Sequence, residues 1–147
     1  MKTIVYIDGF NLYYGLLRGT RNMWLDLERF AQSLLTDQHS IIELKYFTAR
    51  VRGDMYDDIS AHDQFCYLRA LVSGDSDQAA PLSVIRRRLG KKTVVFNPHS
   101  GDSVELRKLT TFYRNIPREL PPKCQLPDEV VLPDGTAVHR PLAWAKS

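Results

Sequence analysis

Short apolar runs alternate with stretches of helical spacing in the first third of the chain. Residues 3–7 are apolar or β-branched and end at Asp8, which predicts a strand buried on both faces, as in a parallel sheet. Residues 11–17 are expected to form one or two helical turns. Asp26 is a suitable N-cap for a helix with apolar residues at helical spacing, and residues 41–47 are predicted as a second strand. The predicted order is therefore strand, helix, helix, strand.

The same alternation continues through the middle of the chain. Residues 65–72 (FCYLRALV) are predicted either as the end of a helix after Ala61 or as a strand leading into the acidic stretch SGDSD. Further on, the pattern predicts a helix over 81–89, a strand over 92–97 and a last helix over 103–115. Alternating strands and helices predict an α/β fold with a mostly parallel central sheet.

The last thirty residues differ from the rest. Residues 117–144 contain six prolines, and residues 129–139 (EVVLPDGTAVH) predict two short strands joined by a Pro-Asp-Gly turn. We expect a hairpin appendage packed on the core or, alternatively, at a sheet edge. The expected organisation is one domain over residues 1–116, with residues 117–147 as an extension packed on it.

Composition narrows the class of protein. The chain has 147 residues, 44% of them hydrophobic, which suits one domain with its own core. No apolar run approaches the roughly 20 residues that a membrane helix needs, and Asp8 interrupts any signal peptide, so a soluble, cytoplasmic protein is expected. Cys66 and Cys124 show no zinc-binding spacing. The four histidines are scattered and predict neither a metal cluster nor a catalytic pair.

Two groups of acids follow predicted strands. Asp8 follows the first strand, while Asp75 and Asp77 lie in SGDSD between an apolar run and a predicted helix. Because ligands bind at the carboxyl ends of parallel strands, both groups are expected at one edge of the sheet. Crowded carboxylates become favourable when a divalent cation such as Mg²⁺ or Mn²⁺ lies between them. Such an ion suits phosphodiester hydrolysis, because it polarises a phosphoryl oxygen and lowers the pKa of water.

Polar neighbours of the acids are candidates for positioning. Asn11 could present its amide beside Asp8 to orient water or phosphate, and Ser73 and Ser76 could donate hydrogen bonds to the carboxylates or the substrate. The simpler alternative is that Asp8 belongs to a turn and SGDSD to a helix cap. The occurrence of both at one sheet edge favours a functional site.

Basic and aromatic residues suggest that the protein binds nucleic acid, although each group also has a purely structural explanation. Net charge is +3, but basic residues cluster in RRRLGKK (residues 86–92), which includes Arg87 and Lys91 and lies on the helix that SGDSD introduces. This run could contact RNA or simply form a solvated helix face. Tyr13, Tyr14 and Trp24 could stack on unpaired bases, or could belong to the core.

Four blocks together resemble one protein family. They are VYIDGFNLYYGL (residues 5–16), KYFTARV (45–51), LVSGDSD (71–77) with Pro81-Leu82, and GKKTVVFNPH (90–99). In this order they resemble the NYN domain, a branch of the PIN-like nucleases. The resemblance spans most of residues 3–116.

The resemblance implies a Rossmann-like α/β/α sandwich and a Mg²⁺- or Mn²⁺-dependent ribonuclease site. It assigns Asp8, Asp75 and Asp77 to the metal, Asn11 to the same acidic site, and Arg50 to a substrate-facing basic position. RNA, single-stranded by expectation, is the implied partner, and a homodimer is an open alternative for assembly.

One departure from the family weakens the metal site. Between the KYFTARV and SGDSD blocks, NYN proteins usually carry a Glu-Lys-x-x-Asp pattern that adds a carboxylate, and no such pattern occurs between Arg52 and Leu71. We expect that residues of a longer chain are missing from this interval; a natural or an engineered deletion is the alternative.

The leading hypothesis is therefore a metal-dependent ribonuclease. The first alternative is a catalytically weakened RNA-binding module, and a structural role is the third, favoured if the region around Asp8 is buried.

Overall fold

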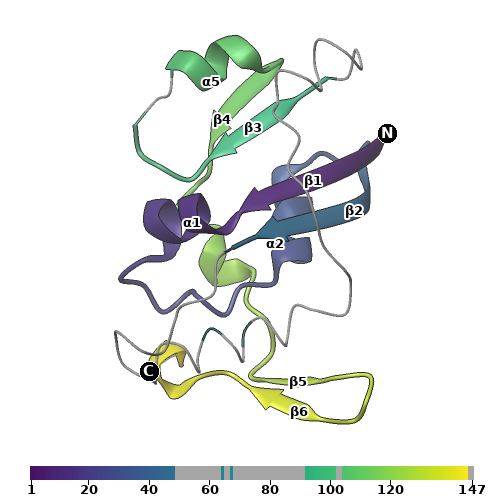
Figure 1. Ribbon diagram of the computed structural model, residues 1–147, viewed down its shortest axis with the longest axis vertical. Coiled ribbons are helices and arrows are strands. Elements are labelled where there is room, and N and C mark those ends of the chain that lie inside the picture. The colour runs from purple at the N-terminus through teal and green to yellow at the C-terminus, as the bar shows by residue number, and fades with distance from the viewer. Residues whose placement is uncertain (49–63, 65–66, 68–91, 102–103, 146–147) are drawn as a thin grey trace.

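The computed structural model describes residues 1–48, 64, 67, 92–101 and 104–145 (Figure 1). The segment over 65–72, expected as the end of a helix or as a strand, lies outside these residues except for Tyr67, and the predicted helix over 81–89 lies wholly outside them. The backbone at Gln64 and Tyr67 is helical. Several expected site residues also lie outside: Arg50, Ser73, Asp75, Ser76, Asp77, Arg87 and Lys91. The sequence of 147 residues is continuous. The expectation that residues are missing between Arg52 and Leu71 is therefore wrong, and the short interval belongs to this chain.

The first two strands form a parallel pair. Strand β1 (Lys2–Asp8) pairs with β2 (Ser40–Phe47), which confirms both predicted strands. The expectation that the first strand is buried on both faces is wrong, because every second residue of β1 is exposed. The pairing brings Asp8 opposite Phe47 at the carboxyl ends of the two strands. Their connection contains the short helix α1 (Gly9–Leu12), a π-helix η1 (Tyr13–Leu17) and helix α2 (Leu27–Leu34).

Helix α2 begins where the sequence predicts. The Asp26 carboxylate accepts a hydrogen bond from the N–H of Arg29 at 2.9 Å, which satisfies one of the unpaired donors of the first turn. The helix buries Leu27, Phe30 and Ala31. A local capping signal and an apolar stripe are therefore enough to define this element.

A second parallel pair consists of β3 (Val94–Asn97) and β4 (Phe112–Asn115), with helix α5 (Val104–Leu109) between them. The predicted helix over 103–115 is therefore wrong in its second half. The Thr110 hydroxyl donates to the Leu106 carbonyl at 2.9 Å, and the N–H of Thr111 donates to the Thr93 carbonyl at 2.9 Å. These bonds end the helix and start the strand, because two β-branched residues favour extended backbone there.

The C-terminal segment forms its own hairpin. Strands β5 (Glu129–Val131) and β6 (Ala137–His139) are antiparallel, which confirms the predicted pair of strands. Gly135 adopts φ of 82° in the connecting turn, a conformation that favours glycine. Short 3₁₀ helices η2 (Pro121–Lys123) and η3 (Leu142–Trp144) flank the hairpin.

The core joins the N-terminal and C-terminal parts of the chain. Trp24 and Leu25 are fully buried, and the Trp24 indole donates to the Pro127 carbonyl at 2.7 Å. The rings of Trp24, Tyr67 and Trp144 pack against one another. Residues 117–145 therefore contribute to the main core.

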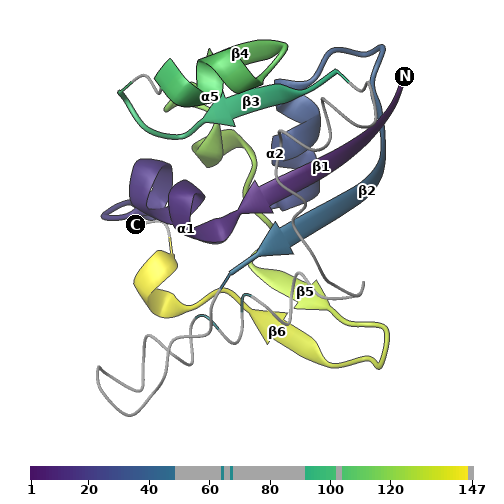
Figure 2. The same cartoon turned by 45° about the horizontal axis from the view of Figure 1, so that its top comes forward.

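The described residues form an α/β structure with three two-stranded sheets, two of them parallel. In both views β1, β2 and β3 run in the same direction, with their carboxyl ends toward α1 (Figures 1 and 2). None of the described helices is long and apolar enough to cross a membrane.

Candidate functional site

Asp8 lies exposed at the carboxyl end of β1 and is fixed by its own turn. One carboxylate oxygen, Oδ1, accepts the N–H groups of Phe10 at 3.0 Å and Asn11 at 3.1 Å, so Asp8 is the N-cap of α1. The other oxygen, Oδ2, accepts a 2.7 Å hydrogen bond from Asn11 Nδ2. The structure thus brings together the two expected residues that it describes.

Asn11 connects this turn to the second pair of strands. Its amide oxygen lies 3.5 Å from Nε2 of His99, at the long limit of a hydrogen bond. His99 is exposed and follows β3 in the segment Asn-Pro-His. A row of three polar side chains therefore runs from the end of β1 to the end of β3.

Asn97, the last residue of β3, holds the loop that carries His99. The Asn97 side chain is buried, with 7% exposed, and its Nδ2 donates to the carbonyls of His99 at 3.0 Å and Gly101 at 2.7 Å. Its Oδ1 accepts the N–H of His99 at 3.2 Å, and Asn115 Oδ1 at the end of β4 lies 3.3 Å from Nδ2. The loop position is therefore set by a buried amide.

Two glycines allow the close packing around these residues. A Cβ on Gly15 would lie 2.9 Å from the Pro98 carbonyl carbon, and a Cβ on Gly9 would lie 2.6 Å from the Tyr46 hydroxyl. Both distances are shorter than van der Waals contact. The helical segment after Asp8 can approach β2 and the loop after β3 only because these positions lack a side chain.

Tyr46 contributes a neutral phenol near Asp8. Burial raises the pKa of Tyr46 most, the negative charge of Asp8 raises it further, and a hydrogen bond with Thr48 lowers it. The phenol therefore stays protonated well above neutral pH. Polar residues at or next to the carboxyl ends of β1, β2, β3 and β4 gather at one side: Asp8, Tyr46, Asn97 and Asn115.

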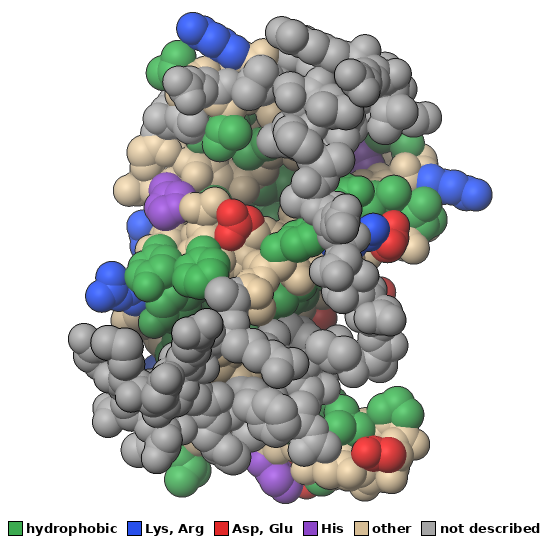
Figure 3. Space-filling view, viewed as in Figure 1, with side chains coloured by type: hydrophobic (Ala, Val, Ile, Leu, Met, Phe, Trp, Pro, Cys, Tyr) green, Lys and Arg blue, Asp and Glu red, His purple; other side chains and the backbone are tan. Residues whose placement is uncertain are grey.

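Exposed aromatic side chains lie beside Asp8. Phe10 and Tyr14 are 49% and 54% exposed and stacked, and the Arg18 guanidinium lies over the Tyr14 ring at 5.3 Å. Tyr13 is exposed as well and meets Tyr14 edge to face. Hydrophobic side chains gather over α1 and η1 on the face shown in Figure 3. Trp24, the third aromatic residue considered for stacking, belongs to the core.

Three residues beside Asp8 are absent from the residues predicted from sequence: His99, Asn97 and Tyr46. The Asn-Pro-His segment belongs to the family resemblance, but the scattered histidines of the sequence give no sign that His99 lies near Asp8. The signal that was available is the position of Asn97 and His99 directly after an apolar strand, the same position that singled out Asp8.

The described residues at this site offer oxygen ligands of the kind that a hard cation prefers. A carboxylate on Asp8 and an amide oxygen on Asn11 are ligands that Mg²⁺ accepts. Within the described ranges, no three His, Cys, Asp or Glu side chains come together as a metal-binding group. Asp75 and Asp77, the other expected ligands, lie outside the described residues, so their approach to Asp8 stays a prediction.

Comparison with known proteins gives one partial similarity. No family model and no solved structure matches the chain. Over 66 residues the chain is 41% identical to the 6-hydroxy-3-succinoylpyridine 3-monooxygenase HspA of Pseudomonas putida (strain DSM 28022 / S16). The match covers 35% of this chain and 21% of that protein. The chain thus spans about a fifth of the relative's length, and this similarity does not assign it to a family.

Proposed function

We propose that this protein is a divalent-metal-dependent ribonuclease of the NYN type, with Asp8 in its active site. The observation that carries the proposal is the exposed Asp8–Asn11 pair beside His99 at the carboxyl ends of parallel strands. In parallel α/β proteins, this edge is where ligands bind. Because Asp8 is exposed, its carboxylate is accessible to a substrate.

The fold proposed with this function is a PIN-like α/β/α sandwich, in which the two parallel pairs belong to one mostly parallel sheet. Two contacts support this arrangement: Asn11 meets His99, and Gly15 packs closely on Pro98. Both contacts join the helical segment after β1 to the loop after β3. The common direction of β1, β2 and β3 agrees with it (Figure 2).

Asp8, Asp75 and Asp77 are the residues proposed to hold Mg²⁺ or Mn²⁺. A bound ion of this kind supplies a Lewis acid for the scissile phosphate and favours deprotonation of water. Asn11 fixes the orientation of the Asp8 carboxylate by donating to Oδ2. His99 and the neutral Tyr46, which both lie next to this turn, donate hydrogen bonds to phosphate oxygens in this proposal.

A single-stranded substrate is supported by the surface next to Asp8. Phe10, Tyr13 and Tyr14 expose ring surface on which unpaired bases can stack, and Arg18 adds a positive charge beside Tyr14. Further substrate contacts are proposed for residues outside the described ranges: Arg50, Ser73, Ser76, Arg87 and Lys91.

The alternative is an RNA-binding module with a weakened catalytic site. It is favoured by one observation: both Asp8 oxygens already accept hydrogen bonds from the turn that follows. A capping role alone is enough to explain this aspartate. The aromatic surface beside it would then bind RNA without cleaving it.

Cleavage of a labelled single-stranded RNA, with Mg²⁺ or Mn²⁺ and with chelator, tests the proposal. Asp8→Asn keeps the shape and the capping ability of the side chain but removes its charge. We expect a loss of roughly a hundredfold in rate, as for other electrostatic groups in active sites. Asp37→Asn is the matched control, because Asp37 is exposed and precedes β2 at the opposite end of the strands; it should change the rate less than about twofold.

Each outcome separates the alternatives. Cleavage that survives chelation or Asp8→Asn contradicts the proposed mechanism, whereas salt-dependent RNA binding without cleavage supports the binding module. The relative's name denotes a monooxygenase of 6-hydroxy-3-succinoylpyridine. Turnover of that compound by this chain, without RNA cleavage, would replace the nuclease proposal.

A further inference from the structure

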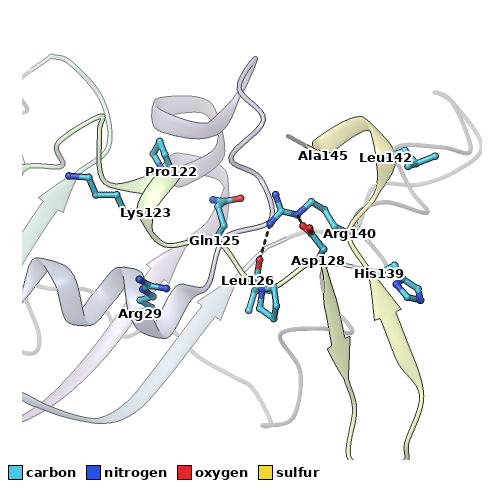
Figure 4. A pocket seen from close by; sticks show the side chains of 11 residues that line it. Arg29, Pro122, Lys123, Gln125, Leu126, Asp128, His139, Arg140, Leu142 and Ala145 are labelled. Atoms are coloured by element: carbon cyan, nitrogen blue, oxygen red, sulfur yellow. Dashed lines mark hydrogen bonds and ion pairs between the residues drawn. The ribbon is translucent and has the colours of Figure 1, made fainter. Parts of the chain in front are cut away.

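A cavity of about 730 Å³ lies between α2 and the C-terminal segment (Figure 4). Its described lining includes Arg29 of α2, Lys123 of η2, Gln125, and Arg140 directly after β6. This volume is within the range of small-ligand sites, about 300–1,000 Å³. None of these residues belongs to the proposed nuclease site.

The described lining carries an excess of positive charge. Arg29, Lys123 and Arg140 are cations, whereas Asp128 is the acid among the described lining residues, and it is paired with Arg140 at 2.9 Å. Arg29 and Lys123 therefore have no acidic partner among the described lining residues. Such a cavity favours an anion over a neutral ligand.

Arg140 is buried with part of its hydrogen-bonding capacity unused. Its side chain is 6% exposed, and Nη2 donates to the Leu126 carbonyl at 2.8 Å. The contact of Nε with Asp128 is an ion pair that lacks hydrogen-bond alignment, and Nη1 has no acceptor within the described part of the chain. Buried guanidinium groups normally pair all their N–H groups, so a missing acceptor points to a ligand.

Gln125 has a buried acceptor without a donor, whereas Arg140 has a buried donor without an acceptor. Its Nε2 donates to the carbonyls of Asn22 at 3.0 Å and Pro121 at 2.9 Å, which fixes the orientation of the amide. Its buried Oε1 has no donor among the described residues. The cavity therefore offers cations for an anion and a buried acceptor for a hydroxyl or amino group.

We propose that this cavity binds a phosphate ester that also carries a free hydroxyl, as a ribonucleotide does. In this complex Arg29 and Lys123 contact the phosphate, the buried Arg140 adds its unused N–H group, and the ligand hydroxyl donates to Gln125 Oε1. The phosphate can come from a free nucleotide or from the backbone of an RNA strand. The proposal goes beyond the nuclease site and does not depend on it.

Titration calorimetry of the full chain in the presence of chelator tests the site. The probes are adenosine 5′-monophosphate, adenosine, and a twelve-nucleotide single-stranded RNA. We expect the phosphate-bearing probes to bind and adenosine not to bind. The double variant Arg29→Gln/Lys123→Gln should weaken binding at least about tenfold, which is the effect of one lost charge-assisted contact.

Three further variants make the result decisive. Lys2→Gln is the matched control, because Lys2 is exposed at the start of β1, outside the cavity lining. Asp8→Asn should leave binding of the monophosphate at the cavity unchanged, which separates this site from the nuclease proposal. Arg140→Lys keeps the charge but removes the planar group, so it should weaken binding as well.

Binding of the monophosphate identifies a nucleotide site, and binding of the RNA alone, if the double variant weakens it, identifies a backbone site. The proposal is overturned if neither probe binds at millimolar concentration, or if the double variant binds as tightly as the unchanged protein. It is also overturned if Arg140→Lys alters only the thermal midpoint, since Arg140 then serves only to tie the hairpin to residues 126–128.

Discussion

Asn97 shows how one buried side chain supports the candidate site at the scale of the residue. Its amide holds both sides of the loop that carries His99, and the side chain is 7% exposed. Replacement by alanine would leave the carbonyls of His99 and Gly101 and the N–H of His99 without this partner.

We expect Asn97→Ala to lower the free energy of unfolding by about 1–3 kcal/mol, because three part-buried hydrogen bonds are lost. Urea denaturation of both proteins measures the difference. Asn115→Ala is the control: its side chain is exposed and its contact with Asn97 is long, at 3.3 Å, so a change below about 0.5 kcal/mol is expected. Equal midpoints for Asn97→Ala and the unchanged protein would show that the amide network is not stabilising.

The buried Tyr67 and the partly buried Tyr46 predict a loss of stability in alkali. Burial is the main cause that raises the pKa of both Tyr46 and Tyr67 above the ordinary value of 10.0. Above pH 10 the unfolded chain releases these protons while the folded protein retains them. The free energy of unfolding therefore stays constant below about pH 10 and falls as the pH rises beyond it.

The variant Tyr67→Phe tests the predicted alkaline loss of stability at the more buried of the two tyrosines. The variant loses the hydrogen bond to the Leu25 carbonyl at 2.8 Å, which costs about 1 kcal/mol at neutral pH, but it should decline less steeply between pH 9 and pH 11. Urea unfolding across that range measures both effects. The exposed Tyr6 provides the control variant, Tyr6→Phe. An unchanged alkaline slope for Tyr67→Phe would contradict the expected release of protons on unfolding.

Single residues were predictable where their partners are close in sequence. Asp26 caps the helix that starts next to it, and Asp8 lies three residues from Asn11, so both arrangements follow from local spacing. His99 meets Asn11 across 88 residues. No local pattern encodes that contact, because it depends on how β3 is placed relative to β1.

At the scale of the element, residues 103–115 show why a periodic pattern can mislead. Leu109, Phe112 and Ile116 repeat at helical spacing, yet α5 ends at Leu109 and β4 begins at Phe112. The stripe is the same whether or not the backbone stays helical. Hydrogen bonds from Thr111 to Thr93 decide between the two, and they exist only once β3 is in place.

The contact between η1 and the loop after β3 predicts a steric effect at Gly15. In Gly15→Ala the new Cβ would lie 2.9–3.0 Å from Pro98 backbone and ring atoms, which cannot rotate away. We expect a destabilisation of about 1–3 kcal/mol, typical of an overpacked contact. The loop bearing His99 should be displaced, so nuclease activity, if present, should fall as well.

Gly101→Ala is the matched control for this contact. Gly101 lies in the same loop region, and a Cβ there meets no atom within 4 Å. Thermal and urea unfolding should differ from the unchanged protein by less than about 0.5 kcal/mol. If both alanine variants behave alike, the approach of η1 to Pro98 is not a constraint on the fold.

At the scale of the whole molecule, the C-terminal segment is more than a hairpin on the surface. Leu25 forms a bridge with Gln125, the N–H of Asp26 donates to the Cys124 carbonyl, and Trp24 is buried under this segment. The sequence predicted its two strands from the Pro-Asp-Gly turn. It did not predict that the proline-rich segment would complete the core, because these contacts join residues about a hundred positions apart.

Removal of the Trp144 ring tests how much the end of the chain contributes to the stability of the whole protein. Its ring lies 6.3 Å from that of Trp24 and 5.9 Å from that of Tyr67, so Trp144→Ala should destabilise the protein by about 3 kcal/mol, the low end for aromatic truncation because Trp144 is only partly buried. Leu142→Ala in the same short helix is the control, since Leu142 is 93% exposed and should contribute less than about 0.5 kcal/mol. Trp24 directly precedes Leu25 and Asp26, the N-cap of α2. Loss of the Trp144 ring should therefore destabilise α2 as well as the C-terminal hairpin. Amide hydrogen exchange in Trp144→Ala should thus rise in residues 24–34 as well as in β5 and β6; a rise confined to the hairpin would mean that the two regions are stable independently of each other.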